Sequence, residues 1–187
     1  EKVLNDRTQI LKFNSMIRNE NERMNKYVER ILLQAKLDRR EVHLKKVPVN
    51  LNVLVDEAVE HFRLQVEEKG GVIRAELDPE GYVMSADEVH MLNVVCNLID
   101  NAIKYSHDSL NIYIYTKQEG NRFIIGVRDT GIGIPKEAQD KVIKRFYRVP
   151  SGNLHNVKGF GLGLSYAKSI VELHGGEIQL TSKKNKG

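Results

Sequence analysis

Three asparagines and a lysine recur at helical spacing in the segment 88–105. One face of the helix predicted there carries His90, Asn93, Asn97, Asn101 and Lys104, and the opposite face is apolar. Asn costs a helix roughly half a kcal/mol relative to Ala, so three in one helix interior require a reason. One explanation is a solvated polar face. The other is a wall of amide oxygens and one ammonium group facing phosphates and Mg²⁺, which prefers hard oxygen ligands.

A carboxylate stands at the end of an apolar strand predicted over 122–129, and a glycine-containing turn follows it, Asp129-Thr130-Gly131-Ile132-Gly133-Ile134-Pro135. A carboxylate in such a position needs a hydrogen-bond donor, and the exocyclic amine of adenine is a suitable one. Gly131 and Gly133 would let the backbone approach a flat ring closely. Taken alone, the segment is better explained as a tight turn before a helix.

A second glycine-rich segment, Gly159-Phe160-Gly161-Leu162-Gly163-Leu164, runs directly into a helix predicted over 162–174. Free backbone N–H groups and the positive end of the helix dipole suit a triphosphate. The segment lacks the Lys and Ser or Thr of a P-loop. It also follows a helix and a long loop, whereas a dinucleotide-binding turn follows the first strand of a βαβ unit.

The elements that must position these residues alternate between strand and helix. After an extended stretch at 43–49, Asn50 caps a helix that ends at Gly70-Gly71, and Ser85 with Glu88 forms a capping box for the helix to about Tyr105. Strands are predicted at 72–77, 82–84, 111–116, 122–129 and 177–181, a short helical region at 135–146 and a loop at 149–158. This order predicts a two-layer α/β sandwich, a mixed sheet with helices on one face. We expect a further strand beyond Gly187 to pair with the last one.

The N-terminal segment 6–38 predicts one long helix that begins with a capping box of Asp6 and Gln9. Its apolar residues alternate at steps of three and four, with one charged position in the seam: Ile10, Phe13, Ile17, Glu20, Met24, Tyr27 and Ile31. Such a heptad seam packs against another helix and is not stable alone. We therefore expect two domains, an incomplete helical hairpin at 1–40 and an α/β domain at 46–187. A generic coiled-coil linker is the alternative for the first.

Composition excludes several classes of protein. The chain of 187 residues is 41% hydrophobic and 29% charged, as in soluble globular proteins, and it has no apolar run long enough for a membrane span. Lys and Arg are scattered among Asp and Glu with a net charge of +4, so we expect no nucleic-acid partner. Cys96 is the single cysteine and is expected to be an ordinary core thiol in a reducing, cytoplasmic compartment.

These motifs together resemble those of a known family. The segments 97–106, 129–135 and 159–164 resemble the asparagine box and the two glycine boxes of sensor histidine kinases, and Arg145-Phe146-Tyr147-Arg148 resembles the phenylalanine box. The resemblance covers 47–187, and the upstream helix is similar to the second helix of the family's dimerisation and phosphotransfer hairpin. It implies a Bergerat-type ATP-binding domain in a homodimeric parent protein, membrane-anchored with this part in the cytoplasm, and a response regulator as partner.

The resemblance also implies a role for each matching residue. Asn101 would bind Mg²⁺, Asn97 and Lys104 would lie at the phosphates, and Arg148 would offset charge on the transferred phosphoryl group. Asp129 would bind the adenine amine, with Gly131 and Gly133 beside the ring, and Tyr105 and Ile134 would lie close to the nucleotide. The phosphate-binding backbone and its flanks would be formed by Lys158, Gly159, Gly161, Gly163 and Leu164, with Leu162 holding the loop to the core. The loop 149–158 would be a lid over ATP.

The phosphoacceptor of the family is a His followed by an acidic residue and, a little later, Pro on the first hairpin helix. His43 and Pro48 have that separation, but they follow the long helix, lie in an extended stretch and lack the acidic neighbour. We therefore expect the chain to bind ATP without phosphorylating itself. Two alternatives stay open. An ATPase of the gyrase and chaperone type would need a carboxylate base where Asn97 stands, and a regulatory module would bind nucleotide without catalysis.

Overall fold

The computed structural model describes residues 7–39, 41–106, 110–149 and 160–187. The chain divides into two compact units, Glu1–Val42 and His43–Gly187. No helix within the described residues is both long enough and apolar enough to cross a bilayer.

The first unit is a single helix, α1 (Arg7–Asp38), which agrees with the helix predicted over 6–38. An ion pair links Glu20 to Arg23 one turn later, and the Arg23 guanidinium lies 5.7 Å from the centre of the Tyr27 ring. Four of the seam residues present exposed apolar side chains: Phe13, Ile17, Met24 and Ile31. The predicted cap Asp6 lies outside the described residues. The apolar seam is therefore open to a partner helix.

Helix α2 (Leu51–Glu68) has the predicted start and the predicted buried face. Asn50 is its N-cap, because the Asn50 side chain accepts hydrogen bonds from the backbone N–H groups of Asn52 and Val53. All the side chains expected in the core are buried: Leu51, Leu54, Val55, Ala58, Val59 and Phe62. The helix is followed by Gly70 at φ +67°, a backbone conformation that glycine adopts without steric cost.

The main sheet has three strands in the order β2 (Val72–Glu76), β4 (Asn111–Glu119) and β5 (Arg122–Asp129). Strands β2 and β4 run parallel, with Ile73 opposite Ile112, whereas β4 and β5 form an antiparallel hairpin around Gly120-Asn121. A separate antiparallel pair joins β1 (Val47–Asn50) to β3 (Val83–Ala86). The mixed sheet is therefore confirmed.

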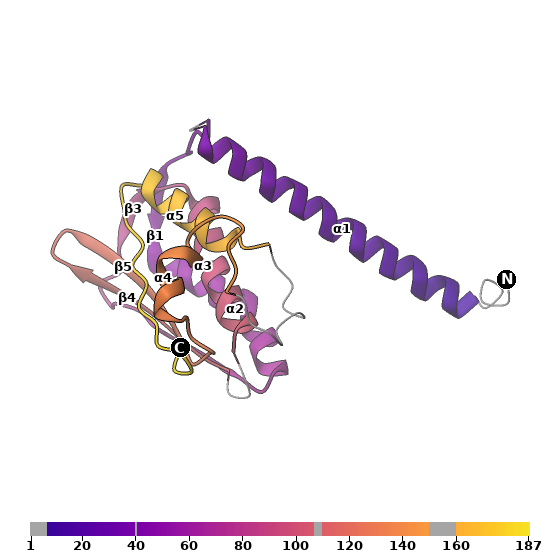
Figure 1. Ribbon diagram of the computed structural model, residues 1–187. Helices are drawn as coiled ribbons and strands as arrows, with labels where there is room; N and C mark the ends of the chain where they lie inside the picture. The colour runs from indigo at the N-terminus through magenta and orange to yellow at the C-terminus, as the bar shows by residue number, and fades with distance from the viewer. Residues whose placement is uncertain (1–6, 40, 107–109, 150–159) are drawn as a thin grey trace. The chain divides into compact units, whose positions relative to one another are not determined.

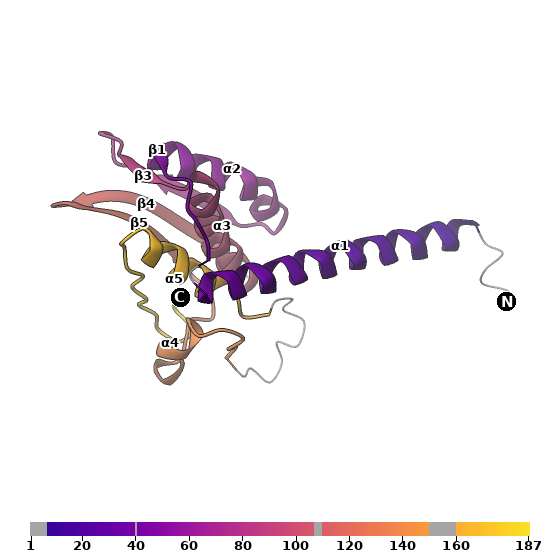
Figure 2. The ribbon, with the colours of Figure 1, turned by 90° about the horizontal axis from the view of Figure 1, so that it is seen from above.

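Helices cover one face of the three-stranded sheet (Figure 1). Helix α3 (Glu88–Lys104) lies between α2 and α5 (Gly163–Leu173) and contacts both (Figure 2). The core between helices and sheet is formed by fully buried side chains: Val55, Val59 and Val66 from α2, Val95 and Ile99 from α3, Ile112 and Ile114 from β4, and Ile170 from α5. This arrangement is the two-layer α/β sandwich that the sequence predicts.

The predicted capping box of α3 is wrong. Ser85 lies inside β3, where it is paired with Pro48 of β1, and is therefore part of a strand when the helix begins. The N-cap is Asp87, whose side chain accepts the backbone N–H of His90 at 3.1 Å. The strand predicted at 82–84 is found at 83–86, because these residues pair with β1.

The strand predicted at 177–181 is also absent. Within the described residues, no ladder of backbone hydrogen bonds joins this segment to β5, and one side-chain pair links the two, from Arg122 to Glu177 at 3.0 Å. Alternating apolar residues do not form a strand without a partner whose N–H and C=O groups they can bond. The segment instead leads into a terminal turn in which Lys183 N–H donates to the Gly187 carbonyl at 2.8 Å.

Candidate functional site

On the polar face of α3, Asn97 and Asn101 are half-buried and Asn93 is exposed. The Asn97 amide nitrogen donates to the Asn93 carbonyl at 2.8 Å, which fixes the Asn97 side chain along the helix. The Lys104 ammonium is bound by Asp100, with Nζ 2.5 Å from Oδ2. Lys104 therefore has a carboxylate partner in this structure, and contact with a phosphate requires it to release or share Asp100.

The second glycine-rich segment meets the polar face of α3 at Gly163, the first residue of α5. A Cβ atom on Gly163 would lie 3.2 Å from Asn97 Oδ1 and 3.7 Å from Asn101 Nδ2. The preceding Leu162 is buried and anchors the helix start in the core. Two residues that stand 66 positions apart in the sequence, Asn97 and Gly163, are thus brought close together. The positive end of the α5 dipole lies against the amide side chains.

The first glycine-rich segment is bound to the C-terminal end of α3, about one turn beyond Asn101. Asp129 Oδ1 accepts the N–H of Gly131 at 2.8 Å, and Ile132 N–H donates to the Tyr105 carbonyl at 2.9 Å. A Cβ on Gly131 would lie 2.5 Å from that same Tyr105 carbonyl oxygen, so glycine is required by the close approach of the two backbones. The hydrogen bond from Gly131 therefore holds the Asp129 carboxylate in one orientation, in which it can accept a further hydrogen bond.

The C-terminal turn at 182–187 lies on the first glycine-rich segment. Ile134 N–H donates to the Ser182 hydroxyl and Asn185 N–H to the Ile132 carbonyl, both at 2.7 Å. Gly133 has φ +62°, and a Cβ on it would collide with the Lys183 carbonyl. This contact was not predicted, because the last predicted element was the strand at 177–181 and no turn was expected at 182–187.

The phenylalanine-box segment contacts the second glycine-rich segment. Phe146 N–H donates to the Gly161 carbonyl at 3.0 Å, and a Cβ on Gly161 would lie 2.7 Å from the Tyr147 carbonyl oxygen. Phe146 has φ +58°, an unusual conformation for a bulky residue, and its side chain is 60% exposed. The helical region predicted at 135–146 is shorter, because α4 spans Lys136–Val142.

The outer parts of the predicted site are less constrained. Arg148 is exposed and Leu164 is half-buried. Lys158, Gly159 and nearly all of the predicted lid at 149–158 lie outside the described residues. Among the residues that are described, no group of three or more His, Cys, Asp and Glu side chains is placed to hold a metal ion. A divalent cation would therefore depend on amide oxygens and on the phosphates of a ligand, which is the way Mg²⁺ binds with few protein ligands.

Two contacts between α3 and α5 were not predicted. His90 Nδ1 lies 2.9 Å from the Tyr166 hydroxyl, and Asp87 N–H donates to His174 Nε2 at 2.9 Å. The available signal was helical spacing, since His90 precedes Asn97 by seven residues and Tyr166 follows Gly163 by three. Spacing alone does not identify the partner on the other helix.

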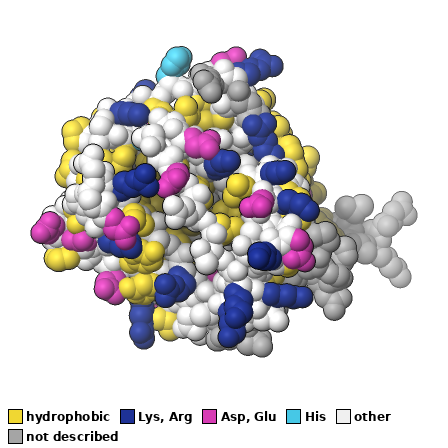
Figure 3. Space-filling view, turned by 60° about the vertical axis from the view of Figure 1, so that its left-hand side comes forward, with side chains coloured by type: hydrophobic (Ala, Val, Ile, Leu, Met, Phe, Trp, Pro, Cys, Tyr) yellow, Lys and Arg dark blue, Asp and Glu magenta, His cyan; other side chains and the backbone are white. Residues whose placement is uncertain are grey.

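Charged side chains of both signs are mixed on one face of the molecule, where Lys and Arg lie among Asp and Glu (Figure 3). Burial raises the pKa of the Asp87 carboxyl, but hydrogen bonds from the N–H groups of His90 and Lys45 outweigh burial, and the pKa is lowered overall. Burial raises the pKa of Cys96, which is half-buried and less enclosed than the core thiol expected from sequence.

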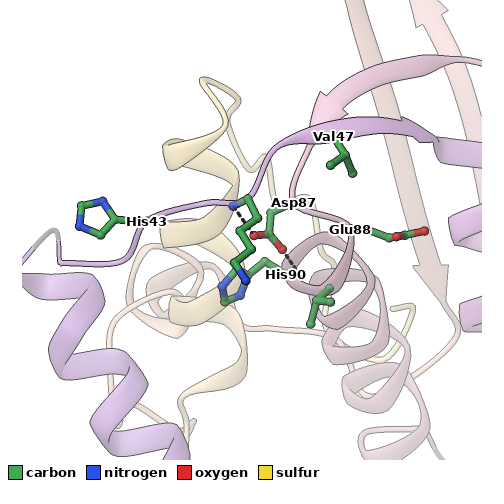
Figure 4. Close-up of a pocket in the computed structure, with 7 residues that line it drawn as sticks. His43, Val47, Asp87, Glu88 and His90 are labelled. Atoms are coloured by element: carbon green, nitrogen blue, oxygen red, sulfur yellow. Dashed lines mark hydrogen bonds between the residues drawn. The ribbon is translucent and has the colours of Figure 1, made fainter.

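A pocket of about 330 Å³ lies at the N-terminal end of α3 (Figure 4), and it is lined by His43, Lys45, Val47, Asp87, Glu88, Val89 and His90. Asn101 is thirteen residues along the helix from Glu88, roughly 20 Å at the helical rise of 1.5 Å per residue. This pocket is therefore separate from the place where Asn97, Asn101 and Gly163 meet.

Known proteins resemble this chain in sequence and in fold. The model of the family described as "Histidine kinase-, DNA gyrase B-, and HSP90-like ATPase" matches residues 86–187, more than half of the chain. The sensor protein RprX of Bacteroides fragilis is 41% identical over 174 residues, 92% of this chain and 34% of RprX. The sensor histidine kinase WalK of Bacillus subtilis is 33% identical over 178 residues, 94% of this chain and 29% of WalK. The chain thus spans about a third of the length of these curated relatives.

A solved structure has the same fold. The Acinetobacter baumannii histidine kinase AdeS superposes with a TM-score of 0.76 at 23% identity, over 97% of this chain and 81% of that chain. At this identity the likeness concerns the fold alone.

Proposed function

The chain belongs to the histidine kinase-, DNA gyrase B- and HSP90-like ATPase family, and from that premise we propose that it is the ATP-binding catalytic portion of a sensor histidine kinase. It would transfer the γ-phosphoryl group of ATP to a histidine on a hairpin helix, for relay to a response regulator. The named relatives RprX and WalK are sensor kinases, which supports this branch of the family over the gyrase and chaperone branch.

The observation that carries the proposal is the contact between Gly163 and the asparagines of α3. The N-terminal end of α5 offers backbone N–H groups and a partial positive charge, and Asn97 Oδ1 and Asn101 Nδ2 lie beside them. Such a site suits phosphates together with a hard cation. Asn97 cannot act as a base toward water, which favours transfer to a side chain over hydrolysis.

The adenine end of the proposed site lies at Asp129. Its Oδ1 atom is occupied by Gly131 N–H, so the carboxylate is held in one orientation and Oδ2 is the atom we expect to accept the adenine amine. Tyr105, Gly133 and Ile134 flank this position along the chain and would contact the ring. The C-terminal half of α3, from Asn97 to the C-cap Tyr105, thus serves both ends of one nucleotide.

The phosphate end would be completed by positively charged groups and backbone amides. We propose that Lys104 and Arg148 contact phosphate oxygens, and that the amides of Gly161, Gly163 and Leu164 donate to them. Lys158 and Gly159 would join this set, although they lie outside the described residues. The residues present also fit a Mg²⁺ ion, which Asn101 would hold through its amide oxygen, and the bound ion would offset phosphate charge.

The first unit is proposed to be the second helix of a dimerisation hairpin. The exposed seam of α1, with Phe13, Ile17 and Met24, has the spacing and exposure that a partner helix requires. We propose a homodimer through this hairpin in the parent protein, and a cytoplasmic location for this part of a membrane-anchored parent. The mixed charges of the surface support a protein partner, such as a response regulator, over nucleic acid.

The proposal is tested by phosphotransfer. The chain is incubated with radioactive ATP, with and without a separately supplied hairpin that carries the phosphoacceptor histidine. We expect acid-labile label on the supplied hairpin and none on this chain, because His43 lies in a non-helical segment with no acidic neighbour. Label on the chain itself would refute the assignment of the acceptor to a separate helix. Tight ATP binding without transfer would favour a regulatory module.

A further inference from the structure

Helices α3 and α5 are linked at two points besides the contact at Gly163. Asp87 bonds His174, His90 lies against Tyr166, and Asn97 lies against Gly163. Residue numbers rise along α3 as they fall along α5, so the two helices run antiparallel. Three contacts thus follow one another along the helix pair. The first is a hydrogen bond from the Asp87 backbone to the His174 side chain, the second joins the side chains of His90 and Tyr166, and the third is the approach of Gly163 to Asn97.

His174 forms the first link with both of its ring nitrogens. Nε2 accepts the N–H of Asp87 at 2.9 Å, and Nδ1 lies 2.8 Å from the Ile170 carbonyl oxygen. Because Nε2 must be an acceptor and a carbonyl cannot donate, Nδ1 carries the proton and the ring is neutral. The imidazole is therefore fixed at the C-terminal end of α5.

Asp87 extends that link to two further elements. Its Oδ1 atom caps α3 through His90 N–H, and its Oδ2 atom accepts the N–H of Lys45 at 2.8 Å, in the segment that leads into β1. Figure 4 draws both hydrogen bonds as dashed lines at Asp87. The side chain is only 7% exposed. One end of the helix pair is thus attached to the body of the domain.

The second link lies between that attachment and the proposed phosphate site. The Tyr166 hydroxyl is 2.9 Å from His90 Nδ1, and the two rings are 6.2 Å apart at their centres. Tyr166 follows Gly163 by three residues, less than one turn of helix. A displacement of α5 along α3 at Tyr166 therefore moves Gly163 by a similar amount.

We propose that His90 and Tyr166 are positioning residues, which together with Asp87 and His174 set the register of α5 along α3. Gly163 has no side chain with which to hold its own place. A slip of α5 along α3 by one residue, a rise of about 1.5 Å, would carry the start of α5 away from Asn97. The links thereby keep the amides at the start of α5 opposite the asparagines. The role in setting the register rests on the geometry alone, whereas the effect on nucleotide binding rests on the proposed function.

Tyr166→Phe tests the second link, because it removes one hydroxyl and keeps the ring. The matched control is Tyr113→Phe, which removes a hydroxyl bonded to Glu76 on the face of the sheet away from the helices. Two quantities are measured on each variant: amide hydrogen exchange at 161–164 and at 131–133, and the affinity for the Mg²⁺ complex of a non-hydrolysable ATP analogue. Circular dichroism checks that each variant is folded.

We expect Tyr166→Phe to speed exchange at 161–164, to leave 131–133 unchanged, and to weaken analogue binding about three- to tenfold, the loss of one net hydrogen bond. Tyr113→Phe should change neither quantity. Unchanged exchange and unchanged affinity in Tyr166→Phe would overturn the inference. If the parent chain bound no analogue, the proposed function would fail, and the exchange rates would still decide whether the register depends on Tyr166.

A second pair of variants protects the test against a general loss of packing. In His90→Asn the side-chain amide occupies nearly the place of Nδ1 and can still bond the Tyr166 hydroxyl, whereas His90→Ala cannot. We expect His90→Asn to retain most of the affinity and slow exchange, and His90→Ala to lose both. Equal behaviour of the two would contradict a role for the hydrogen bond.

Discussion

Gly163→Ala is expected to separate stability from nucleotide binding. Gly163 is the first residue of α5, and its backbone is not in the left-handed region, so alanine fits the helix. Replacing a helical glycine by alanine stabilises a protein by about 0.4–1 kcal/mol. The new methyl group would lie 3.2 Å from Asn97 Oδ1, closer than most real Cβ contacts, and 3.7 Å from Asn101 Nδ2. Asn97 must shift by a few tenths of an ångström, at the place where phosphates are expected.

The affinity for ATP should therefore fall in Gly163→Ala while the melting temperature stays equal or rises. Losing one hydrogen bond to a charged phosphate costs about 1.5–3 kcal/mol, a factor of at least ten in the dissociation constant. Calorimetric titration and thermal unfolding measure the two effects.

Gly120→Ala is the matched control, because a Cβ there meets nothing within 4 Å but the backbone has φ +60°. It should lower stability by about 1 kcal/mol and leave affinity unchanged. Tight ATP binding by Gly163→Ala would refute the location of the phosphates.

Three further predictions concern the cap, the buried carboxylate and the adenine contact. Asn50→Ala should reduce the free energy of unfolding by about 1 kcal/mol in urea titrations, since it removes the side-chain acceptor for the N–H groups of Asn52 and Val53, and ATP affinity should not change. The pKa of Asp87 is lowered in the folded protein, so the ionised carboxylate stabilises the fold fully above the unfolded pKa near 3.9, and this stability is lost as pH falls through the folded pKa. Melting temperatures recorded from pH 5 down to pH 2.5 should therefore depend less on pH in Asp87→Asn than in the parent chain. An equal dependence in the two proteins would contradict this. Asp129→Asn should weaken ATP binding at least tenfold and reduce the preference for ATP over GTP, because an amide presents a donor as well as an acceptor to the adenine amine. An equal preference for ATP over GTP in both proteins would show that Asp129 does not bind adenine.

Local signals in the sequence predicted the elements that depend on neighbouring residues. The cap at Asn50 and the apolar spacing after it define α2, and the turn at Gly120-Asn121 defines the hairpin whose second strand begins at Arg122 as expected. Ser85 failed as a cap although Ser85 and Glu88 fit the capping pattern well. The deciding interaction is its pairing with Pro48, 37 residues away, which no local pattern encodes. The strand at 177–181 failed for the same reason, since alternation does not supply a partner.

The candidate site likewise combines features with a local sequence signal and features that depend on long-range packing. The residue types of the asparagine and glycine segments indicated phosphate and metal chemistry, and the resemblance to sensor histidine kinases implied their assembly. The contact of Gly163 with Asn97 and the bonds of Asp87 and His90 to α5 join residues 66 to 87 positions apart, and they depend on how two helices pack. The positive φ of Phe146 likewise has no local signal, because phenylalanine is seldom found in that conformation.

The most direct test of the central claim is calorimetric titration of ATP with and without Mg²⁺ into the chain and into Asn101→Ala. Asn101 is half-buried on the polar face of α3, 3.7 Å from where a side chain at Gly163 would begin. The proposed site predicts binding that requires Mg²⁺ in the parent chain and is lost in the variant. Binding that is independent of Mg²⁺ and equal in both proteins would contradict it.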